Sequence, residues 1–157
     1  MQKSIHYKKV FKHISSLKSS CLIIDWQRPG SGLLQGCLDD HPQILQLPGI
    51  IRFYNFWRKN KKNKSISKLL NLFINDDQFK YIFDSKINKY ERWHQLGHKR
   101  NEYFKIDKKL FVKHAINLIK GEKFNVKNFL LSILGSYFIT RKKNIFKTKI
   151  IFIHLHR

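Results

Sequence analysis

The sequence has few acidic residues, only two cysteines and no long apolar run, and each scarcity excludes a class of protein. Ten Asp and Glu residues stand against 32 Lys and Arg among 157 residues, so the formal net charge is +22. A chain of this charge attracts polyanions or anionic substrates. Hydrophobic residues still make up 42% of the chain and aromatic residues 14%, which indicates a folded domain. We expect one domain over residues 1–157, because the length is too short for two.

The cysteines and the apolar segments bear on the compartment. Cys21 and Cys37 have no C-x-x-C spacing and predict small, buried apolar side chains in a reducing compartment. Residues 1–20 are basic without a continuous apolar core, which excludes a secretory signal. The longest apolar-leaning run, Phe129–Ile139, is interrupted by two serines and a glycine and is too short to span a membrane. We therefore expect a cytoplasmic protein.

The positive charge is spread unevenly along the chain. Residues 1–20 carry five lysines and no acid, residues 21–50 have a net charge of −2, and residues 51–157 have +19. Two explanations stay open, because Lys, Asn and Ile are all abundant. The charge either serves to bind a polyanion or reflects a genome rich in A and T, so it is weak support for nucleic-acid binding.

The segment Cys21–Pro42 combines an apolar run, a glycine-rich turn and a helical pattern. Leu22–Asp25 predicts a strand, Arg28–Gly32 a turn, and the apolar spacing from about residue 31 to 39 a helix. Glycines let the backbone approach a ligand closely, and the first N–H groups of a helix have no partner inside it. A phosphate or sulfate can supply that partner, and Arg28 can add a bidentate contact. The order predicts a cradle for an anionic group.

Two common phosphate-binding motifs are not matched by this turn. A Walker loop needs Lys before Ser or Thr, whereas the sequence here continues Gly30-Ser31-Gly32-Leu33. A dinucleotide fingerprint needs a glycine where Gln35 stands. A purely structural tight turn remains the alternative.

The remaining chain predicts one helical stretch between strands. Residues 1–20 read as a basic lead-in with a short amphipathic helix. Gln43–Leu47 predicts a second strand, and the apolar residues at 149–157 predict a buried terminal strand. Arg58–Lys64 is the best candidate for an exposed loop. Helical spacing of apolar residues marks five segments: Ser67–Phe73, Phe79–Phe83, Tyr90–Leu96, Lys109–Ile119 and Val126–Ile139. Gly121 fits a helix stop.

The first motif resembles the signature of the sulfotransferases. The run Gln27–Leu34, followed by Leu38–Pro42, is similar to the family pattern P-[RK]-S-G-[ST]-T-x-L with L-x-x-H-P after a short helix. In that family the loop holds the 5′-phosphosulfate of 3′-phosphoadenosine 5′-phosphosulfate (PAPS). The resemblance implies that PAPS is the co-substrate. It assigns the phosphosulfate contacts to the following residues: Arg28, Gly30, Ser31, Gly32 and Leu33.

The second family signature is a strand that ends in Arg, usually R-D-P-R, with a Ser beyond it. Ile150–Arg157 is similar to that strand, and Arg157 falls where the first Arg binds the 3′-phosphate. The sequence departs from the pattern elsewhere: Pro29 replaces a Ser and Gly32 replaces a Thr. Pro48 and Gly49 stand where many relatives have a Glu that takes the proton from the acceptor, so the catalytic base is unknown.

The order of elements predicts an α/β fold with a parallel sheet. With the resemblance, the expectation becomes a P-loop NTPase-like three-layer fold with a short parallel sheet and a large helical insertion, incomplete at its carboxyl terminus. The implied reaction is transfer of a sulfuryl group from PAPS to a hydroxyl or amine, impaired in this fragment. The acceptor is open, an anionic polysaccharide would suit the charge, and a missing carboxyl-terminal half would be the partner.

Three weaker residue patterns suggest other kinds of site. His94 and His98 have the i, i+4 spacing that can bind zinc, but no third ligand is recognisable, so we expect no metal. His154 and His156 share one face of the terminal strand and line a cleft or, as we slightly favour, belong to a frayed terminus. The run Arg52–Arg58 interleaves basic and aromatic residues, which can stack on single-stranded nucleic acid. A core-facing helix is the preferred interpretation of that run, and a non-enzymatic nucleic-acid-binding protein remains the alternative function.

Overall fold

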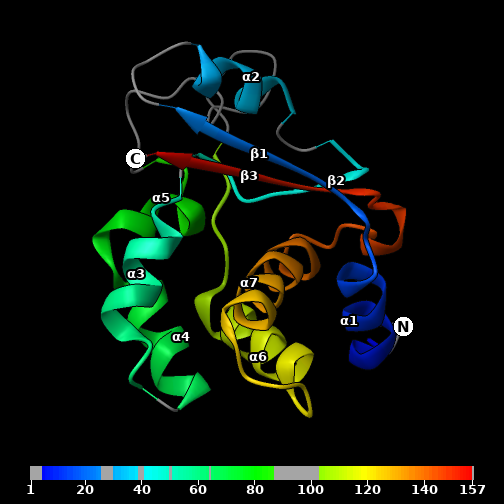
Figure 1. The fold of residues 1–157 in the computed structure, drawn as a ribbon, viewed down its shortest axis with the longest axis vertical. Coiled ribbons are helices and arrows are strands. Elements are labelled where there is room, and N and C mark those ends of the chain that lie inside the picture. Colours follow the sequence, from blue (N-terminus) through cyan, green and yellow to red (C-terminus); the bar gives the residue numbers. More distant parts are fainter. Residues whose placement is uncertain are drawn as a thin grey trace.

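The computed structural model describes residues 5–25, 30–38, 41–49, 51–63, 65–86 and 103–156. Within these ranges a parallel sheet has the strand order β1-β3-β2 (Figure 1). The strands are β1 (Ser19–Asp25), β2 (Ile44–Leu45) and β3 (Ile150–His156). The α/β class and the parallel sheet are therefore confirmed. β1 begins three residues earlier than the predicted strand at Leu22, and β2 is shorter than the predicted strand Gln43–Leu47.

The strand order decides on which face each connection lies. The chain leaves β1 through α2 (Ser31–Leu38), reaches β2 at the far side of β3, and then turns back to insert β3 between them. Right-handed crossovers that travel in opposite directions place their connections on opposite faces of a sheet. Figure 1 shows this arrangement: α2 lies on one side of the strands and the helices between β2 and β3 lie on the other.

The basic lead-in contains the predicted amphipathic helix. Helix α1 spans Tyr7–Ser15 and buries Val10, Phe11 and Ile14. These side chains face α6 (Lys108–Ile119) and α7 (Val126–Thr140), beside which α1 lies in Figure 1. The lead-in is thus part of the core of the domain and not a detached basic arm.

Small residues explain why α7 packs closely on its neighbours. A Cβ atom on Gly135 would lie 3.0 Å from Leu118 Cδ1 and 3.1 Å from Ile14 Cδ1, so glycine lets α1 and α6 approach. Ser136 is buried and donates its hydroxyl to the carbonyl oxygen of Phe111. The residues that interrupt the apolar run are therefore packing residues. Among the described helices, none is long and apolar enough to cross a membrane.

The predicted helices between β2 and β3 are confirmed where the structure describes them. They are α3 (Phe53–Asn60), α4 (Ile66–Asn75), α5 (Lys80–Phe83) and the pair α6 and α7. Gly121 has φ +86° and follows Lys120, the residue that caps α6 after Ile119, so the predicted helix stop is confirmed. The prediction of a loop over Arg58–Lys64 is wrong at its start, because α3 continues through Asn60. The predicted helix Tyr90–Leu96 lies outside the described residues.

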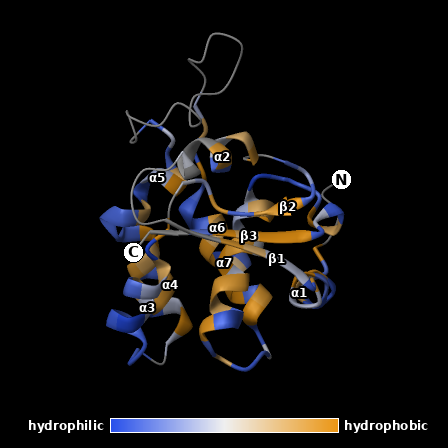
Figure 2. Ribbon diagram, turned by 45° about the horizontal axis from the view of Figure 1, so that its top comes forward, coloured by the Kyte–Doolittle hydropathy of each residue, from blue (hydrophilic) through white to orange (hydrophobic). Residues whose placement is uncertain are grey.

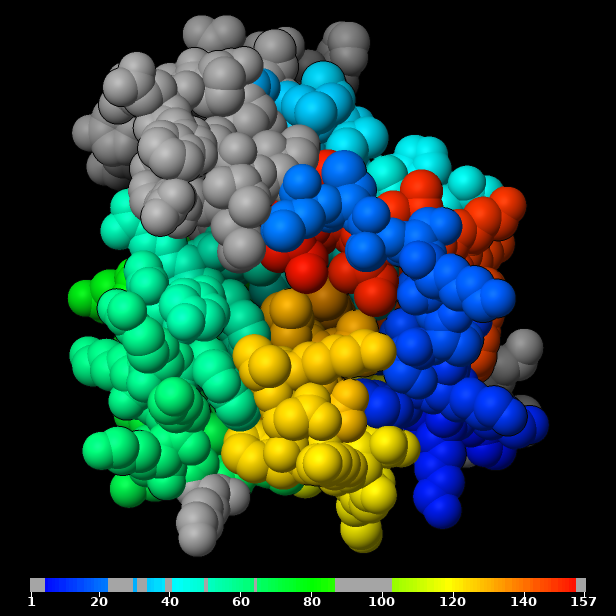
Figure 3. All heavy atoms as spheres, in the orientation of Figure 1, coloured from blue at the N-terminus to red at the C-terminus, as the bar shows by residue number. Residues whose placement is uncertain are grey.

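Aromatic rings fill the core beneath the sheet. The Phe73 and Phe79 centroids are 4.3 Å apart, and Phe83 meets Phe111 edge-on at 5.0 Å. Apolar residues line the inner sides of the helices and polar residues the outer sides, as Figure 2 shows. In the space-filling view the helices α6 and α7 (yellow and orange) lie between α1 (blue) and the green helices α3 and α4 (Figure 3).

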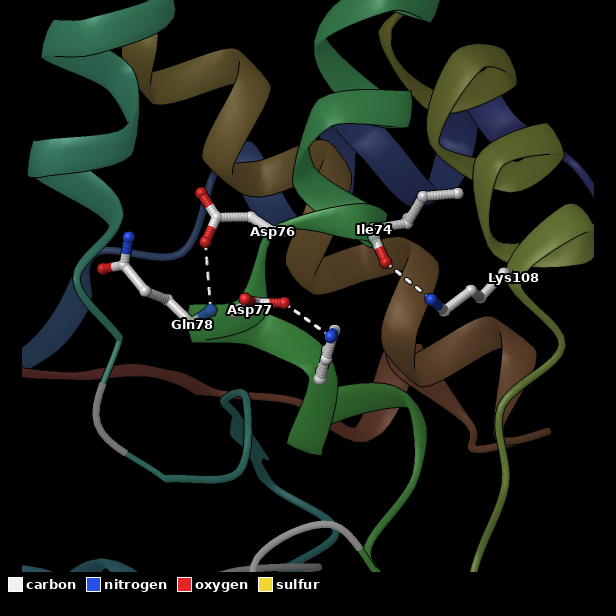
Figure 4. A network of polar contacts seen from close by, with 6 residues as sticks. Ile74, Asp76, Asp77, Gln78 and Lys108 are labelled. Carbon is white, nitrogen blue, oxygen red and sulfur yellow. Dashed lines mark hydrogen bonds and ion pairs between the residues drawn. The ribbon is translucent and has the colours of Figure 1, made fainter.

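Polar contacts hold the junction between α4 and α6. The Lys108 ammonium donates to the carbonyl oxygen of Ile74 at 2.7 Å, which satisfies one of the last carbonyls of α4 (Figure 4). Asp76 Oδ1 accepts the backbone N–H of Gln78 at 3.0 Å and so begins the short 3₁₀ helix η1 (Asp77–Phe79). The ion pair between Asp77 and Lys80 lies beside it on the surface. These contacts are structural.

Candidate anion-binding site

The described residues on either side of the predicted cradle form the expected strand and helix. β1 ends at Asp25 and α2 begins at Ser31, one residue after Gly30. Gly30 is exposed and has φ +81°, and a Cβ atom there would have no neighbour within 4 Å. The backbone conformation, not lack of space, therefore favours glycine at this position. The Gly30 carbonyl oxygen accepts the N–H of Leu34 at 3.1 Å and closes the first turn of α2.

Three of the residues predicted to contact the anion lie at the amino terminus of α2. Ser31, Gly32 and Leu33 form its first turn. The first backbone N–H groups of an α-helix have no acceptor inside the helix, and the helix dipole makes this end partly positive. The predicted helix is thus confirmed as backbone geometry. Arg28, which the prediction places in the same loop, lies outside the described residues.

β3 lies directly beside β1 at the same edge of the sheet. The two strands pair in parallel, with Asp25 opposite His156, so their carboxyl ends are level. Ligand sites of parallel sheets lie beyond this edge. Arg157 follows His156 in the sequence and lies outside the described residues, so its predicted role is untested.

A buried glutamine fastens α2 to β3. Gln35 and His154 are each 1% exposed, and Gln35 Oε1 lies 2.6 Å from His154 Nδ1. The Gln35 Nε2 group donates to the carbonyl oxygens of Leu47 and Gly49. Both amide protons of Gln35 are donated to carbonyl oxygens. Oε1 is therefore the acceptor in the contact with His154, and His154 Nδ1 carries the proton. The helix of the cradle is therefore held by the adjacent strand and by the segment after β2.

The segment after β2 is itself held by a close contact. Gly49 has φ +70°, and a Cβ atom there would lie 2.7 Å from Cε2 of Tyr81. Glycine is thus required both by the conformation and by the approach of the ring. Pro48 and Gly49 stand where the resemblance expects an acidic base, and here Gly49 packs against Tyr81 of α5.

A second buried glutamine has no such role. Gln46 is 2% exposed, and within the described part of the chain neither side-chain amide atom has a hydrogen-bond partner. A buried amide without partners is unfavourable. Gln46 therefore contrasts with Gln35, which has three hydrogen bonds.

Sequence reasoning missed Gln35 and misjudged His154. In the sequence Gln35 serves only to break a glycine fingerprint, although after Ser31 it is the one polar side chain of α2, among leucines, glycines and a cysteine. His154 is buried, so its interpretation as part of a frayed terminus is wrong. The signal was its position two residues after Phe152, which is 3% exposed and shares its face of the strand.

The prediction that both cysteines are buried is also wrong. Cys21 and Cys37 are free and exposed. Cys21 lies on β1, which within the described residues pairs only with β3, and its strand neighbour Leu22 is 54% exposed. A strand at a sheet edge exposes side chains that a central strand would bury.

The basic and aromatic run of α3 faces the core. Phe53 and Phe56 are buried, and Trp57 packs against Phe124 and Phe129 with ring centroids 5.6 Å away in both cases. Only Tyr54, at 63% exposure, is a large exposed aromatic side chain of this helix. The preferred interpretation of a core-facing helix is confirmed, and the run does not offer a row of stacking rings.

Candidate metal ligands do not gather in the described parts of the chain. No group of three His, Cys, Asp or Glu side chains with metal-binding geometry occurs there. His94 and His98 lie outside those parts.

No family model matches the chain, and no curated protein or solved structure is significantly similar to it.

Proposed function

We propose that this chain is a sulfotransferase-like domain that binds the 5′-phosphosulfate group of PAPS at the turn between β1 and α2. The observation that supports it best is the left-handed Gly30 immediately before α2, at the sheet edge where β1 and β3 end level with each other. A strand, a left-handed glycine and a helix amino terminus together suit a tetrahedral oxyanion.

The proposed contacts follow the sequence resemblance. Backbone N–H groups at Ser31, Gly32 and Leu33 face the oxyanion, and Arg28 adds a bidentate charged contact. Arg157, which follows the neighbouring strand, binds the 3′-phosphate of the same nucleotide. The proposed architecture is the P-loop NTPase-like three-layer fold, for which the position of α2 opposite the other helices is the structural support.

The proposed reaction moves one sulfuryl group. The acceptor hydroxyl or amine attacks sulfur, the bond from sulfur to the bridging oxygen breaks, and the nucleotide leaves as the 3′,5′-bisphosphate. The acceptor loses one proton to a base. Cationic and N–H groups at the cradle stabilise the charge that develops on the bridging oxygen. We propose an anionic polysaccharide as the acceptor, because the chain has a net charge of +22.

We propose that nucleotide binding is better preserved than transfer. In the place of the acidic residue that many sulfotransferases use as a base stand Pro48 and Gly49, and both are buried. A general base contributes about 10²–10⁴-fold to a rate. Weak transfer activity with measurable nucleotide binding is therefore the expected behaviour.

A non-enzymatic, nucleic-acid-binding protein is the second candidate. It is favoured by the unneutralised charge: within the described residues one ion pair, Asp77 with Lys80, is found. Against it stands the burial of the aromatic side chains of α3, which removes the stacking contacts that single strands use.

Calorimetry with adenosine 3′,5′-bisphosphate tests the first proposal. Arg28→Ala should weaken binding by about tenfold or more, since a hydrogen bond to a charged group contributes about 1.5–3 kcal/mol. The matched control is Arg58→Ala, which removes the same charge from an exposed position on α3. Equal losses in both variants, or no binding by the intact chain, would refute the cradle.

A salt titration with a thymidine oligonucleotide tests the second candidate. Binding through phosphates should weaken steeply between 50 and 200 mM salt, and it should be unaffected by Arg28→Ala. If Arg28→Ala abolishes bisphosphate binding and the chain binds no oligonucleotide, only the first proposal is supported.

A further inference from the structure

A basic pocket lies at the amino edge of the sheet, opposite the edge at which the cradle lies. Its wall includes His13 from the last turn of α1, Lys18 from just before β1, and Gln43 from just before β2. Lys147, Thr148 and Lys149, from just before β3, complete it. Figure 1 shows these elements converging at the end of the strands away from the labelled carboxyl terminus. We call this the amino-edge pocket.

Hydrogen bonds hold the floor of the amino-edge pocket in place. Thr148 is 2% exposed, and its hydroxyl donates to the carbonyl oxygen of Ile145 at 2.6 Å. His13 Nε2 lies 3.2 Å from both the carbonyl oxygen and the hydroxyl oxygen of Thr148. Since the carbonyl can only accept and the hydroxyl proton is already used, Nε2 must be the donor. The His13 ring also packs on Phe146, with centroids 5.5 Å apart.

Backbone hydrogen bonds place the lysines around this floor. The N–H groups of Lys149 and Ile150 both donate to the carbonyl oxygen of Gln43, at 2.8 and 3.2 Å. The residue that begins β3 is thus tied to the turn before β2. Lys147 and Lys149 flank the buried Thr148 in the sequence. Lys18 lines the pocket from the segment just before β1.

In the part of the chain that the structure describes, no carboxylate neutralises the pocket. None of its lining residues is acidic, and within the described residues no ion pair involves Lys18, Lys147 or Lys149. Three lysines in one pocket repel one another, and an anion between them relieves that repulsion. Lysine is a compact, hydrated charge with three donors, which suits phosphate and sulfate oxygens.

One feature of the pocket opposes an anion, namely the carboxyl end of α1. A helix carries about half a negative charge there. Two of its last carbonyls already accept hydrogen bonds: the Ser15 hydroxyl donates to Lys12 O, and the Ser16 hydroxyl and N–H donate to His13 O. Three full positive charges outweigh this partial charge.

We propose that the amino-edge pocket binds the phosphate or sulfate group of an anionic ligand, and that it is a second oxyanion site separate from the cradle. The seven residues of β3 put about 20 Å between the two edges. With a volume of about 730 Å³ the pocket holds more than a bare oxyanion, so the group can be an ester on a larger molecule.

Titration of the intact chain with inorganic phosphate, followed through the backbone amide NMR signals of Thr148 and Lys149, tests the site. We expect saturating shifts of these signals. The Lys147→Ala, Lys149→Ala double variant should bind phosphate about fivefold or more weakly, because each exposed charge pair contributes modestly. The matched control is Lys61→Ala, Lys62→Ala, two exposed lysines after α3 that change the net charge equally.

Shifts that stay linear with phosphate concentration, or equal losses in the two double variants, would overturn the proposal. The variant Arg28→Ala should bind phosphate at the amino-edge pocket as the intact chain does, which separates this site from the cradle. Inorganic sulfate and a thymidine oligonucleotide are the further arms. An oligonucleotide that moves the same amide signals identifies a nucleic-acid phosphate as the source, whereas shifts with the free ions alone identify a small oxyanion.

Discussion

Gln35 Oε1 accepts a hydrogen bond from His154 Nδ1 at 2.6 Å, and this contact joins the helix of the cradle to the strand that pairs with β1. Both side chains are buried, so the partners left behind by a substitution would stay away from water. The pair also explains how an eight-residue helix with an exposed Leu34 keeps its place over the sheet.

Gln35→Leu should lower the free energy of unfolding by about 2–4 kcal/mol. The change removes three hydrogen bonds at nearly constant volume and leaves the carbonyls of Leu47 and Gly49 without this donor. Gln46→Leu is the matched control, since its buried amide has no hydrogen-bond partner in the described structure, and it should be neutral or stabilising. Urea denaturation measures both, and equal losses would show that Gln35 does not fasten α2.

Gly49→Ala should destabilise the domain more than Gly121→Ala. Both glycines have positive φ, +70° and +86°, so each alanine is strained by about 1–2 kcal/mol. Only at Gly49 would the new Cβ also meet a ring, 2.7 Å from Tyr81 Cε2. The difference between the two midpoints in urea isolates the ring contact. If Gly121→Ala proved the more damaging, the close approach at Gly49 would be discounted.

Acid should weaken the packing of α1 on α6 through His114. This residue is buried and its Nδ1 lies 2.8 Å from the Tyr7 hydroxyl; burial, with a smaller contribution from Lys113, lowers its pKa below 6.5. The folded chain then binds fewer protons than the unfolded chain just below pH 6.5. The stabilisation is therefore complete above the unfolded pKa and is lost as the pH falls toward the lowered folded pKa.

Urea midpoints measured from pH 7.5 to 5 check this dependence. His114→Gln should flatten the loss of stability over that range, whereas His6→Gln, at an exposed histidine, should leave the slope unchanged. An unaltered slope in the His114 variant would remove His114 as the group responsible. Burial also raises the pKa of the Tyr7 hydroxyl, so this partner stays protonated throughout the range.

Both thiols should react in the folded protein. Cys21 and Cys37 are free and exposed, and access of a reagent depends on exposure. A disulfide reagent such as dithionitrobenzoate should titrate two thiols without denaturant, at similar rates before and after unfolding in urea. Cys37→Ser should reduce the count to one. A thiol that reacts only in urea would mean that its side chain is covered in the folded chain.

Helices with strong apolar spacing were predictable from the sequence. The predicted helix at Lys109–Ile119 and the observed α6 differ by one residue at the start, because the amphipathic pattern, the capping Asp107 and the stop at Gly121 are all local. The run of β-favouring residues at the carboxyl terminus likewise identified β3. Glycine at position 30 fits the positive φ found there, because glycine adopts that conformation without steric strain.

By itself the sequence determined the order strand, glycine turn and helix, and the helical stretch before the last strand, because these depend on residues close together in the chain. Only the tertiary structure decided that β3 lies between β1 and β2, which leaves Cys21 exposed on the outer strand. It also decided that Gln35 pairs with His154 across 119 residues, and that three lysines from two distant segments share one pocket. Such contacts depend on how distant segments meet, and a local pattern does not contain that information.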